Sequence, residues 1–203
     1  MITTSRDPTN RLLQFAKELS ILLPNTQRIN RGGTVLEELV ELGLRKGVSD
    51  IVLLHEHRGQ PDGLILCHLP VGPTLYFGLQ NVVLRHDVNE KLQTMPEIYP
   101  HLIFHNFTTG LGLRAQTALQ HLFPVAKPDS QRIITFANKD DVISFRHHTY
   151  EKVTYKEVKL DELGPRFELK LYQISLGLIN QPEATKEWVL RPYMNTATKR
   201  RAL

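Results

Sequence analysis

The residues of this chain that could perform chemistry fall into a few short groups, each with an ordinary structural explanation. His55-Glu56-His57 places two imidazoles on one strand face, but zinc needs further ligands that the sequence does not single out. Gly32-Gly33-Thr34 could offer backbone N–H groups to a phosphate, but the signal is weak and a tight turn before a capped helix is the favoured explanation. Ser5 and Asp7 have no histidine at a spacing that indicates a hydrolase. We therefore expect no catalytic residue, no metal and no cofactor.

Basic and imidazole side chains recur at the predicted strand ends of both halves of the sequence. In the first half they are His55, His57, Arg58 and Arg85, and in the second Arg146 and His148, which share a strand face with Tyr150. An aromatic ring beside cations can stack a base while the cations hold phosphates, as in single-stranded RNA recognition. A sheet edge kept polar against aggregation has the same composition, so both explanations stay open.

These groups need a scaffold, and the hydrophobic pattern predicts one. The expected helices are a segment between Pro8 and Pro24 capped by Ser5 or Asp7, a segment from Thr34 to Lys46 with Glu37 completing a capping box, and residues 113–122. The expected strands are residues 50–54, 64–69, 74–79, 101–104, 132–137, 142–145 and 164–169. Residues 50–54 form an apolar run too short for a helix, which indicates a strand buried on both faces.

A strand, a helix, a buried strand, a hairpin and a Gly-Pro-led strand occur twice in the same order. This pattern is typical of an internal duplication. We predict an α/β fold of two similar halves, with mixed sheets flanked by helices and a ligand cleft between the halves. The expected parts of this single domain of residues 1–203 are an N-terminal half 1–85, a linker 86–99, a C-terminal half 100–190 and a basic tail 191–203.

The charge of the chain is unevenly distributed. Its 203 residues carry 25 Lys and Arg against 21 Asp and Glu, a formal net charge of +4. Residues 1–190 hold 21 of each kind, so the whole excess lies in residues 191–203. Cys67 is the single cysteine, which excludes a disulfide scaffold. No apolar run has membrane-spanning length, and residues 1–6 lack the apolar core of a signal peptide, so we expect a cytosolic or nuclear protein.

Six blocks, spread in order along the chain, resemble the Brix-domain proteins of ribosome assembly, and within that family the branch that belongs to the U3 small nucleolar ribonucleoprotein. The blocks are Thr3–Pro8, His55–Gly59, Asn81–Asp87, Ile134–Asn138, Ser144–His148 and Gly164–Leu169. The resemblance implies that each half is similar to an anticodon-binding domain, in agreement with the repeat. It also places Gly164–Leu169 in a segment that the family associates with RNA binding.

The resemblance further implies a non-enzymatic ribosome biogenesis factor of the small-subunit processome, located in the nucleolus of the nucleus. Such a factor binds U3 small nucleolar RNA and precursor ribosomal RNA and aids their pairing during rRNA processing. Its implied protein partners are the M-phase phosphoprotein scaffold and a small ribosomal-protein-like protein. Neither a membrane nor a small-molecule substrate is implied.

We expect RNA contacts from both halves and from the tail. The candidate residues are Arg6, Arg31, His55, His57, Arg58, Arg85, Arg146, His148, Arg166, Arg191, Lys199, Arg200 and Arg201. The competing hypothesis is a protein-interaction module that docks processome peptides and contacts RNA only incidentally. The neutral charge of residues 1–190 favours it, because a dedicated RNA surface usually shows net basicity. An enzyme is the poorest hypothesis, because no spacing of Asp or Glu indicates the clustered carboxylates of a metal-dependent nuclease.

Overall fold

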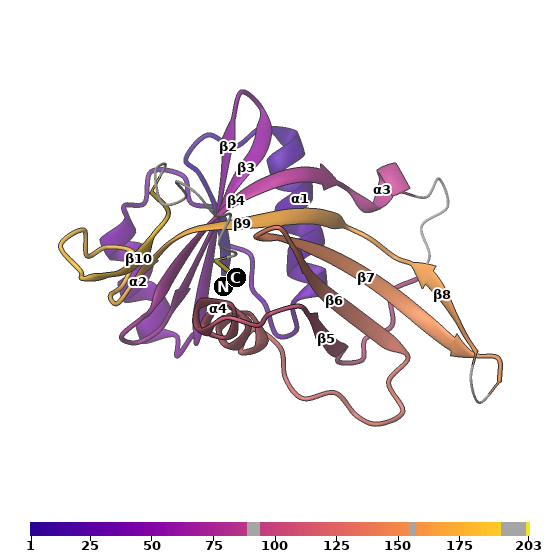
Figure 1. The fold of residues 1–203 in the computed structure, drawn as a ribbon. Coiled ribbons are helices and arrows are strands. Elements are labelled where there is room, and N and C mark those ends of the chain that lie inside the picture. Colours follow the sequence, from indigo (N-terminus) through magenta and orange to yellow (C-terminus); the bar gives the residue numbers. More distant parts are fainter. Residues whose placement is uncertain (89–93, 155–156, 192–201) are drawn as a thin grey trace. The chain divides into compact units, whose positions relative to one another are not determined.

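The computed structural model describes residues 1–88, 94–154, 157–191 and 202–203 (Figure 1). Its elements group into two compact units. Unit 1 consists of Met1–Gln80 and Lys170–Arg200, and unit 2 of Asn81–Leu169 and Arg201–Leu203. Strand β9 (Arg166–Ser175) therefore begins in unit 2 and continues in unit 1.

Unit 1 is built on a mixed sheet. Its other strands are β1 (Ile2–Thr4), β2 (Asp50–His57), β3 (Gln60–His68), β4 (Thr74–Val83) and β10 (Lys186–Val189). The order is β1-β2-β3-β4-β9, with β10 paired to β9. Strands β1 and β2 are parallel, whereas β2, β3 and β4 form an antiparallel meander. Ile51 to Leu54 are all buried, which confirms the predicted strand with two covered faces.

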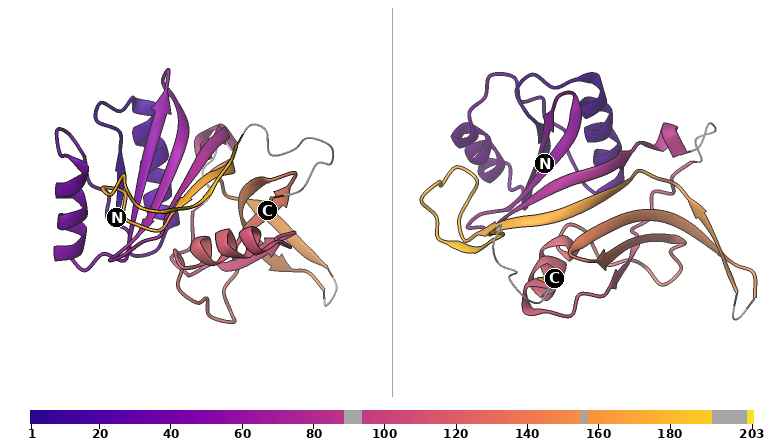
Figure 2. Two further views of the ribbon diagram at one scale, coloured as in Figure 1. Left: turned by 60° about the vertical axis from the view of Figure 1, so that its left-hand side comes forward. Right: turned by 45° about the horizontal axis from the view of Figure 1, so that its top comes forward.

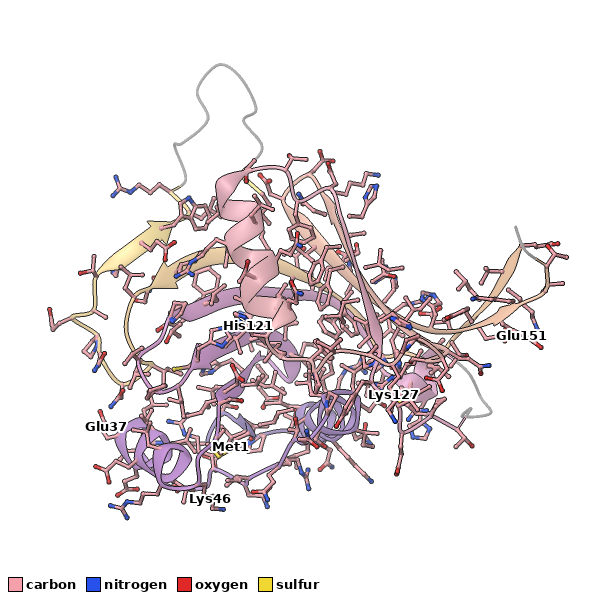
Figure 3. The ribbon with its side chains drawn as sticks, turned by 90° about the horizontal axis from the view of Figure 1, so that it is seen from below. Met1, Glu37, Lys46, His121, Lys127 and Glu151 are labelled. Carbon is pink, nitrogen blue, oxygen red and sulfur yellow. The ribbon has the colours of Figure 1, made fainter. Side chains whose placement is uncertain are left out.

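Two helices cover opposite faces of this sheet (Figure 2). They are α1 (Asn10–Leu22) and α2 (Leu36–Arg45). Helix α2 packs through Leu39 onto Ile51 and Cys67, which point to the same face. Helix α1 lies against β1, β2 and β3. Figure 3 labels Glu37 in the first turn of α2 and Lys46 directly after its last residue.

The start of α1 differs from the prediction. Thr9 caps the helix, not Ser5 or Asp7, and its hydroxyl oxygen accepts a hydrogen bond from the Leu12 N–H. The Thr9 N–H donates to Glu56 Oε1 at 2.9 Å, and the Thr9 hydroxyl donates to Glu56 Oε2. A carboxylate from the end of β2 thus holds the helix N-terminus, where negative charge is favourable.

The start of α2 also corrects the prediction of a capping box. The N-cap is Val35, which makes no side-chain cap, and the helix begins at Leu36. Thr34 instead belongs to the preceding turn, where its N–H donates to the Arg31 carbonyl at 3.1 Å and its carbonyl accepts from Arg31 Nε at 3.2 Å. The end of α2 confirms the prediction, because Gly47 follows the helix with a φ of 64°.

Unit 2 repeats the combination of a mixed sheet and helices. Its strands are β5 (His101–His105), β6 (Arg132–Lys139), β7 (Val142–Lys152), β8 (Val158–Glu162) and the first part of β9, and its helices are α3 (Arg85–Val88) and α4 (Gly110–Gln120). The order is β9-β7-β6-β5, with β8 paired to β7. Strands β5 and β6 are parallel and the other pairs antiparallel.

Aromatic rings form the core of unit 2 across four strands. Phe104 stacks on Phe136 with ring centroids 4.9 Å apart, and Phe136 contacts the edge of Phe145 at 5.3 Å. Phe145 in turn stacks on Phe167 at 4.3 Å. These side chains alternate with half-exposed residues along β6, β7 and β9, so each strand has one core face and one polar face.

The predicted fold class is confirmed: both units combine mixed strands with flanking helices. The order of strand, helix, strand, hairpin and Gly-Pro-led strand recurs in the second part of the chain, from β5 and α4 to β9. The duplication itself, the boundaries of the two halves and the cleft stay predictions. Among the described residues, no helix is long and apolar enough to cross a membrane.

Candidate nucleic-acid interface

Three of the predicted RNA-binding residues come together in unit 1. Arg6 follows β1, His55 lies near the end of β2, and Arg31 belongs to the loop that leads to α2. Burial lowers the pKa of Arg31, and the nearby Arg6 lowers it further. Burial also lowers the pKa of His55; Asp62 opposes this effect and Arg31 adds to it. We call Arg6, Arg31 and His55 the unit 1 cluster.

The two arginines of the unit 1 cluster have no carboxylate partner among the described residues. Arg31 is half-buried and donates one hydrogen bond, from Nε to the Thr34 carbonyl. Arg6 is exposed. Two guanidinium groups close together repel each other, which costs free energy unless an anion lies between or beside them. The arrangement therefore suits a phosphate or another anion.

A second group of predicted residues lies on the polar face of the unit 2 sheet. Arg146 and His148 are half-buried on this face of β7, as the alternation predicts. Glu162 on the neighbouring strand β8 lies opposite His148. Arg146 Nη1 donates to the Phe145 carbonyl at 2.8 Å, so the guanidinium lies along the strand. Arg166 Nη1 lies 3.3 Å from Glu162 Oε2. We call Arg146, His148 and Arg166 the unit 2 cluster.

The unit 2 cluster is electrostatically more balanced than the unit 1 cluster. Glu162 forms an ion pair with Arg166 and also favours the charged form of His148. Burial, the largest effect, nevertheless lowers the pKa of His148, and Arg146 contributes in the same direction. Part of the positive charge is thus already compensated within unit 2.

The neighbouring His147 points to the opposite face and is fully buried, with 0% of its surface exposed. Its Nδ1 lies 2.8 Å from the Gly164 carbonyl, and its Nε2 accepts a hydrogen bond from Arg132 Nε, also at 2.8 Å. The proton consequently resides on Nδ1 of a neutral ring. Burial, with a smaller contribution from Arg132, lowers the pKa of His147 to about 3. Burial also lowers the pKa of Arg132 to about 10.

This buried pair fixes the turn that leads into β9. His147 holds Gly164, whose φ is 65°, a backbone conformation that glycine adopts readily. Arg85 Nε donates to the adjacent Leu163 carbonyl at 3.2 Å. A Cβ at position 164 would lie 3.3 Å from the Arg85 Cα. Arg85, predicted to bind RNA, therefore has a structural contact at this turn.

The other predicted residues that the structure describes belong to neither of the two clusters defined above. His57 ends β2 and Arg58 begins the following turn with a φ of 50°, and both are exposed. Arg191 is exposed after β10. Lys199, Arg200 and Arg201 lie outside the described residues. Within the part of the chain that the structure describes, no three potential ligands gather for a metal ion, at His55-Glu56-His57 or elsewhere.

Sequence reasoning missed two tyrosines beside the unit 1 cluster. Tyr76 on β4 and Tyr172 on β9 have ring centroids 6.0 Å apart. Asp62 acts on the titration of both His55 and Tyr172, so this carboxylate lies near both side chains. Only the pairing of β4 with β9 brings these residues together. The one available signal was the alternation that leaves Tyr172 on the exposed face of its strand.

Comparison with known proteins identifies the family. The Brix domain family matches residues 5–173, which is most of the chain. This protein therefore belongs to the Brix-domain family, as the six sequence blocks predict.

Its relatives point to one branch of the family. The chain is 57% identical to the human "U3 small nucleolar ribonucleoprotein protein IMP4" over 202 residues, which cover 98% of this chain and 69% of the human protein. It is 55% identical to the fission yeast (Schizosaccharomyces pombe) protein of the same name, over 95% of this chain and 67% of the relative. A "Brix domain-containing protein" of Caenorhabditis elegans is 54% identical, over 98% and 68%.

A solved structure supports the fold. The "probable ribosomal biogenesis protein" of Aeropyrum pernix K1 superposes with a TM-score of 0.61, covering 83% of this chain and 93% of the archaeal one. The two sequences are 20% identical, so this likeness concerns the fold alone.

Proposed function

We propose that this chain is a non-enzymatic ribosome biogenesis factor of the small-subunit processome in the nucleolus. It binds U3 small nucleolar RNA and precursor ribosomal RNA and aids their pairing. Membership of the Brix-domain family and the identity to U3 small nucleolar ribonucleoprotein proteins support this proposal. The M-phase phosphoprotein scaffold and a small ribosomal-protein-like protein are its proposed protein partners.

One structural observation carries the RNA-binding part of the proposal. Residues 1–190 are formally neutral, so RNA binding by the folded body requires local separation of basic from acidic groups. The unit 1 cluster supplies such a separation, because Arg6 and Arg31 lie close together and neither has a carboxylate partner among the described residues. Phosphate oxygens would provide the missing negative charge.

The salt dependence of RNA binding tests the proposal. Affinity for a single-stranded U3 fragment is measured by fluorescence anisotropy between 50 and 300 mM salt, roughly the range over which counterion release is resolved. The double variant Arg6→Ala/Arg31→Ala should bind more weakly, and its log–log salt slope should be shallower by about 1.4, since each single-strand phosphate contact contributes about 0.7.

A matched control removes two exposed cations from the C-terminal end of α2 instead, Arg45 and the C-cap residue Lys46. In the double variant Arg45→Ala/Lys46→Ala the net charge changes equally, and Arg45 loses only an exposed pair with Glu41. This control should keep the wild-type slope. If the Arg6/Arg31 variant also binds with wild-type affinity and slope, the unit 1 cluster does not contact RNA.

A second candidate function is a scaffold module that docks processome peptides. Two observations in unit 2 favour it. Strand β5 is the last strand in the order β9-β7-β6-β5, and its Ile103 is 46% exposed. Leu160 on β8 is 56% exposed. An end strand with exposed apolar side chains can accept a peptide as an additional strand. Binding of an M-phase phosphoprotein fragment that needs no RNA and survives high salt would favour this function.

A further inference from the structure

A row of four residues with two glycines at its centre crosses the unit 1 sheet from the unit 1 cluster. His55 on β2 pairs with Gly63 on β3, which pairs with Gly78 on β4. The next strand, β9, continues the row with Lys170, whose carbonyl oxygen would lie 3.9 Å from a Cβ built on Gly78. Neighbouring residues in a row share a face of the sheet, so His55 and Lys170 flank two glycines.

The two glycines differ in what lies over them. A Cβ on Gly63 would come within 3.2 Å of the His55 Cβ, so the imidazole side chain occupies that place. A Cβ on Gly78 would meet nothing closer than the Lys170 carbonyl. The backbone at Gly78 is therefore bare on this face, and its conformation does not demand glycine, because its φ lies outside the left-handed region.

Aromatic rings border the bare backbone. Tyr76 lies two residues before Gly78 on the same face of β4, and its ring is 6.0 Å from that of Tyr172 on β9. Tyr172 is 41% exposed although it lies within a strand. Exposed aromatic rings on a sheet are the usual platform for stacking nucleobases. We call Tyr76, Gly78 and Tyr172 the Gly78 patch.

The charges around the Gly78 patch are of both signs. Lys170 is exposed and forms no ion pair with a described residue, and the unit 1 cluster reaches the patch through His55. Asp62 is the extra residue of a β-bulge opposite His55 and Glu56, and its exposed carboxylate acts on both His55 and Tyr172. Cations beside an aromatic platform suit phosphates, whereas a carboxylate accepts hydrogen bonds from the N–H groups of a base edge.

The geometry points to the Gly78 patch as a binding site for one unpaired guanine base of single-stranded RNA. The base lies over Gly78 and stacks against Tyr172, and its adjacent phosphates lie toward Lys170 and Arg31. Asp62 accepts hydrogen bonds from the neighbouring N1–H and N2–H groups of guanine, two donors that match the two carboxylate oxygens. Uracil offers one such donor. This inference rests on the proposed RNA-binding function.

Filling the bare backbone tests the site without harming the fold. In Gly78→Val the Cβ is accommodated, and a β-branched residue suits a strand, so thermal stability should not fall. The added side chain occupies the place of the base. Affinity for an octamer of uridines with one central guanosine should fall by at least about fivefold, the lower end of what one stacked base contributes. Tyr172→Leu should cause a similar loss, and Tyr172→Phe should not.

Two further measurements separate the elements of the inference. Wild type should prefer the guanosine octamer to octauridine, and Asp62→Asn should reduce that preference. Tyr99→Leu is the matched control, because Tyr99 is 38% exposed and belongs to unit 2; it should bind as wild type does.

The outcomes distinguish this inference from the proposed function. If wild type binds neither of the two octamers nor the single-stranded U3 fragment, the proposed function itself is overturned. If wild type binds RNA but Gly78→Val and Tyr172→Leu bind it equally well, only the guanine site is overturned. The inference would also be overturned if a peptide competed with RNA for wild type and Gly78→Val no longer bound that peptide. The patch would then be a protein-docking surface.

Discussion

Replacing the buried His147 by glutamine should change how the stability of the protein depends on pH. The imidazole is fully buried, accepts a hydrogen bond from Arg132 and lies 2.8 Å from the Gly164 carbonyl. Protonation would place a second positive charge beside the buried Arg132 guanidinium. The folded state therefore keeps the ring neutral well below the usual imidazole pKa of 6.5.

The sign and size of the effect follow from the pKa. Burial lowers the pKa of His147 from 6.5 to about 3, whereas the unfolded chain titrates near 6.5. Stability from the neutral ring is complete above pH 6.5 and is lost as the pH falls toward 3, because the unfolded state then binds a proton that the folded state does not. Between pH 7.5 and pH 5 the loss amounts to about 2 kcal/mol, at 1.36 kcal/mol per pH unit below 6.5.

Urea unfolding followed by far-ultraviolet circular dichroism, at half-unit steps from pH 5 to 7.5, measures this loss. Other titrating groups act equally on both proteins and cancel in the comparison. His147→Gln should be less stable than wild type at pH 7.5 by about 1 to 3 kcal/mol, because the hydrogen bond to Gly164 is weakened. Between pH 7.5 and pH 5, the stability of His147→Gln should then fall by about 2 kcal/mol less than the stability of wild type does.

Exposed His86 provides the control. His86→Gln should reproduce the wild-type profile, because it removes an exposed imidazole instead of the buried one. Parallel profiles for wild type and His147→Gln between pH 5 and 6.5 would refute the reasoning, since the buried ring would then not be the group that titrates.

Two further predictions concern the backbone. Gly164→Ala should destabilise the protein by about 1 kcal/mol or more, because φ is positive there and the new Cβ would press on Arg85; Gly33→Ala, with open space around it, should cost far less in the same thermal melts. Thr9→Ala should cost about 0.5 to 2 kcal/mol in urea unfolding by removing the cap of α1, and an unchanged midpoint would show that Glu56 alone holds the helix end.

Local sequence patterns predicted the elements of both units well. The strand at residues 50–54 follows from a short continuous apolar run, and the opposite orientations of His147 and His148 follow from alternation; the structure confirms both. The helix starts were less predictable. Glu56 is 47 residues from Thr9 in sequence, so no local motif could show that it holds the start of α1.

The candidate site was predictable only in part. The sequence offers Arg6, Arg31 and His55 as candidate RNA-binding residues, but it gives Arg85 and Arg146 the same appearance. The contacts of the folded chain separate them, since Arg85 supports a turn and Arg31 lies beside another arginine. Whether a cation has a partner depends on distances that strand pairing sets.

The sequence by itself determined the kinds of elements, the faces of each strand and the neutral balance of residues 1–190 beside a basic tail. The tertiary structure alone decided that Tyr76 meets Tyr172, that Gly78 stays bare and that Asp62 lies near both Tyr172 and His55. The physical reason is that β4 and β9, about 90 residues apart along the chain, become neighbours only through backbone hydrogen bonds whose register no local side-chain pattern encodes.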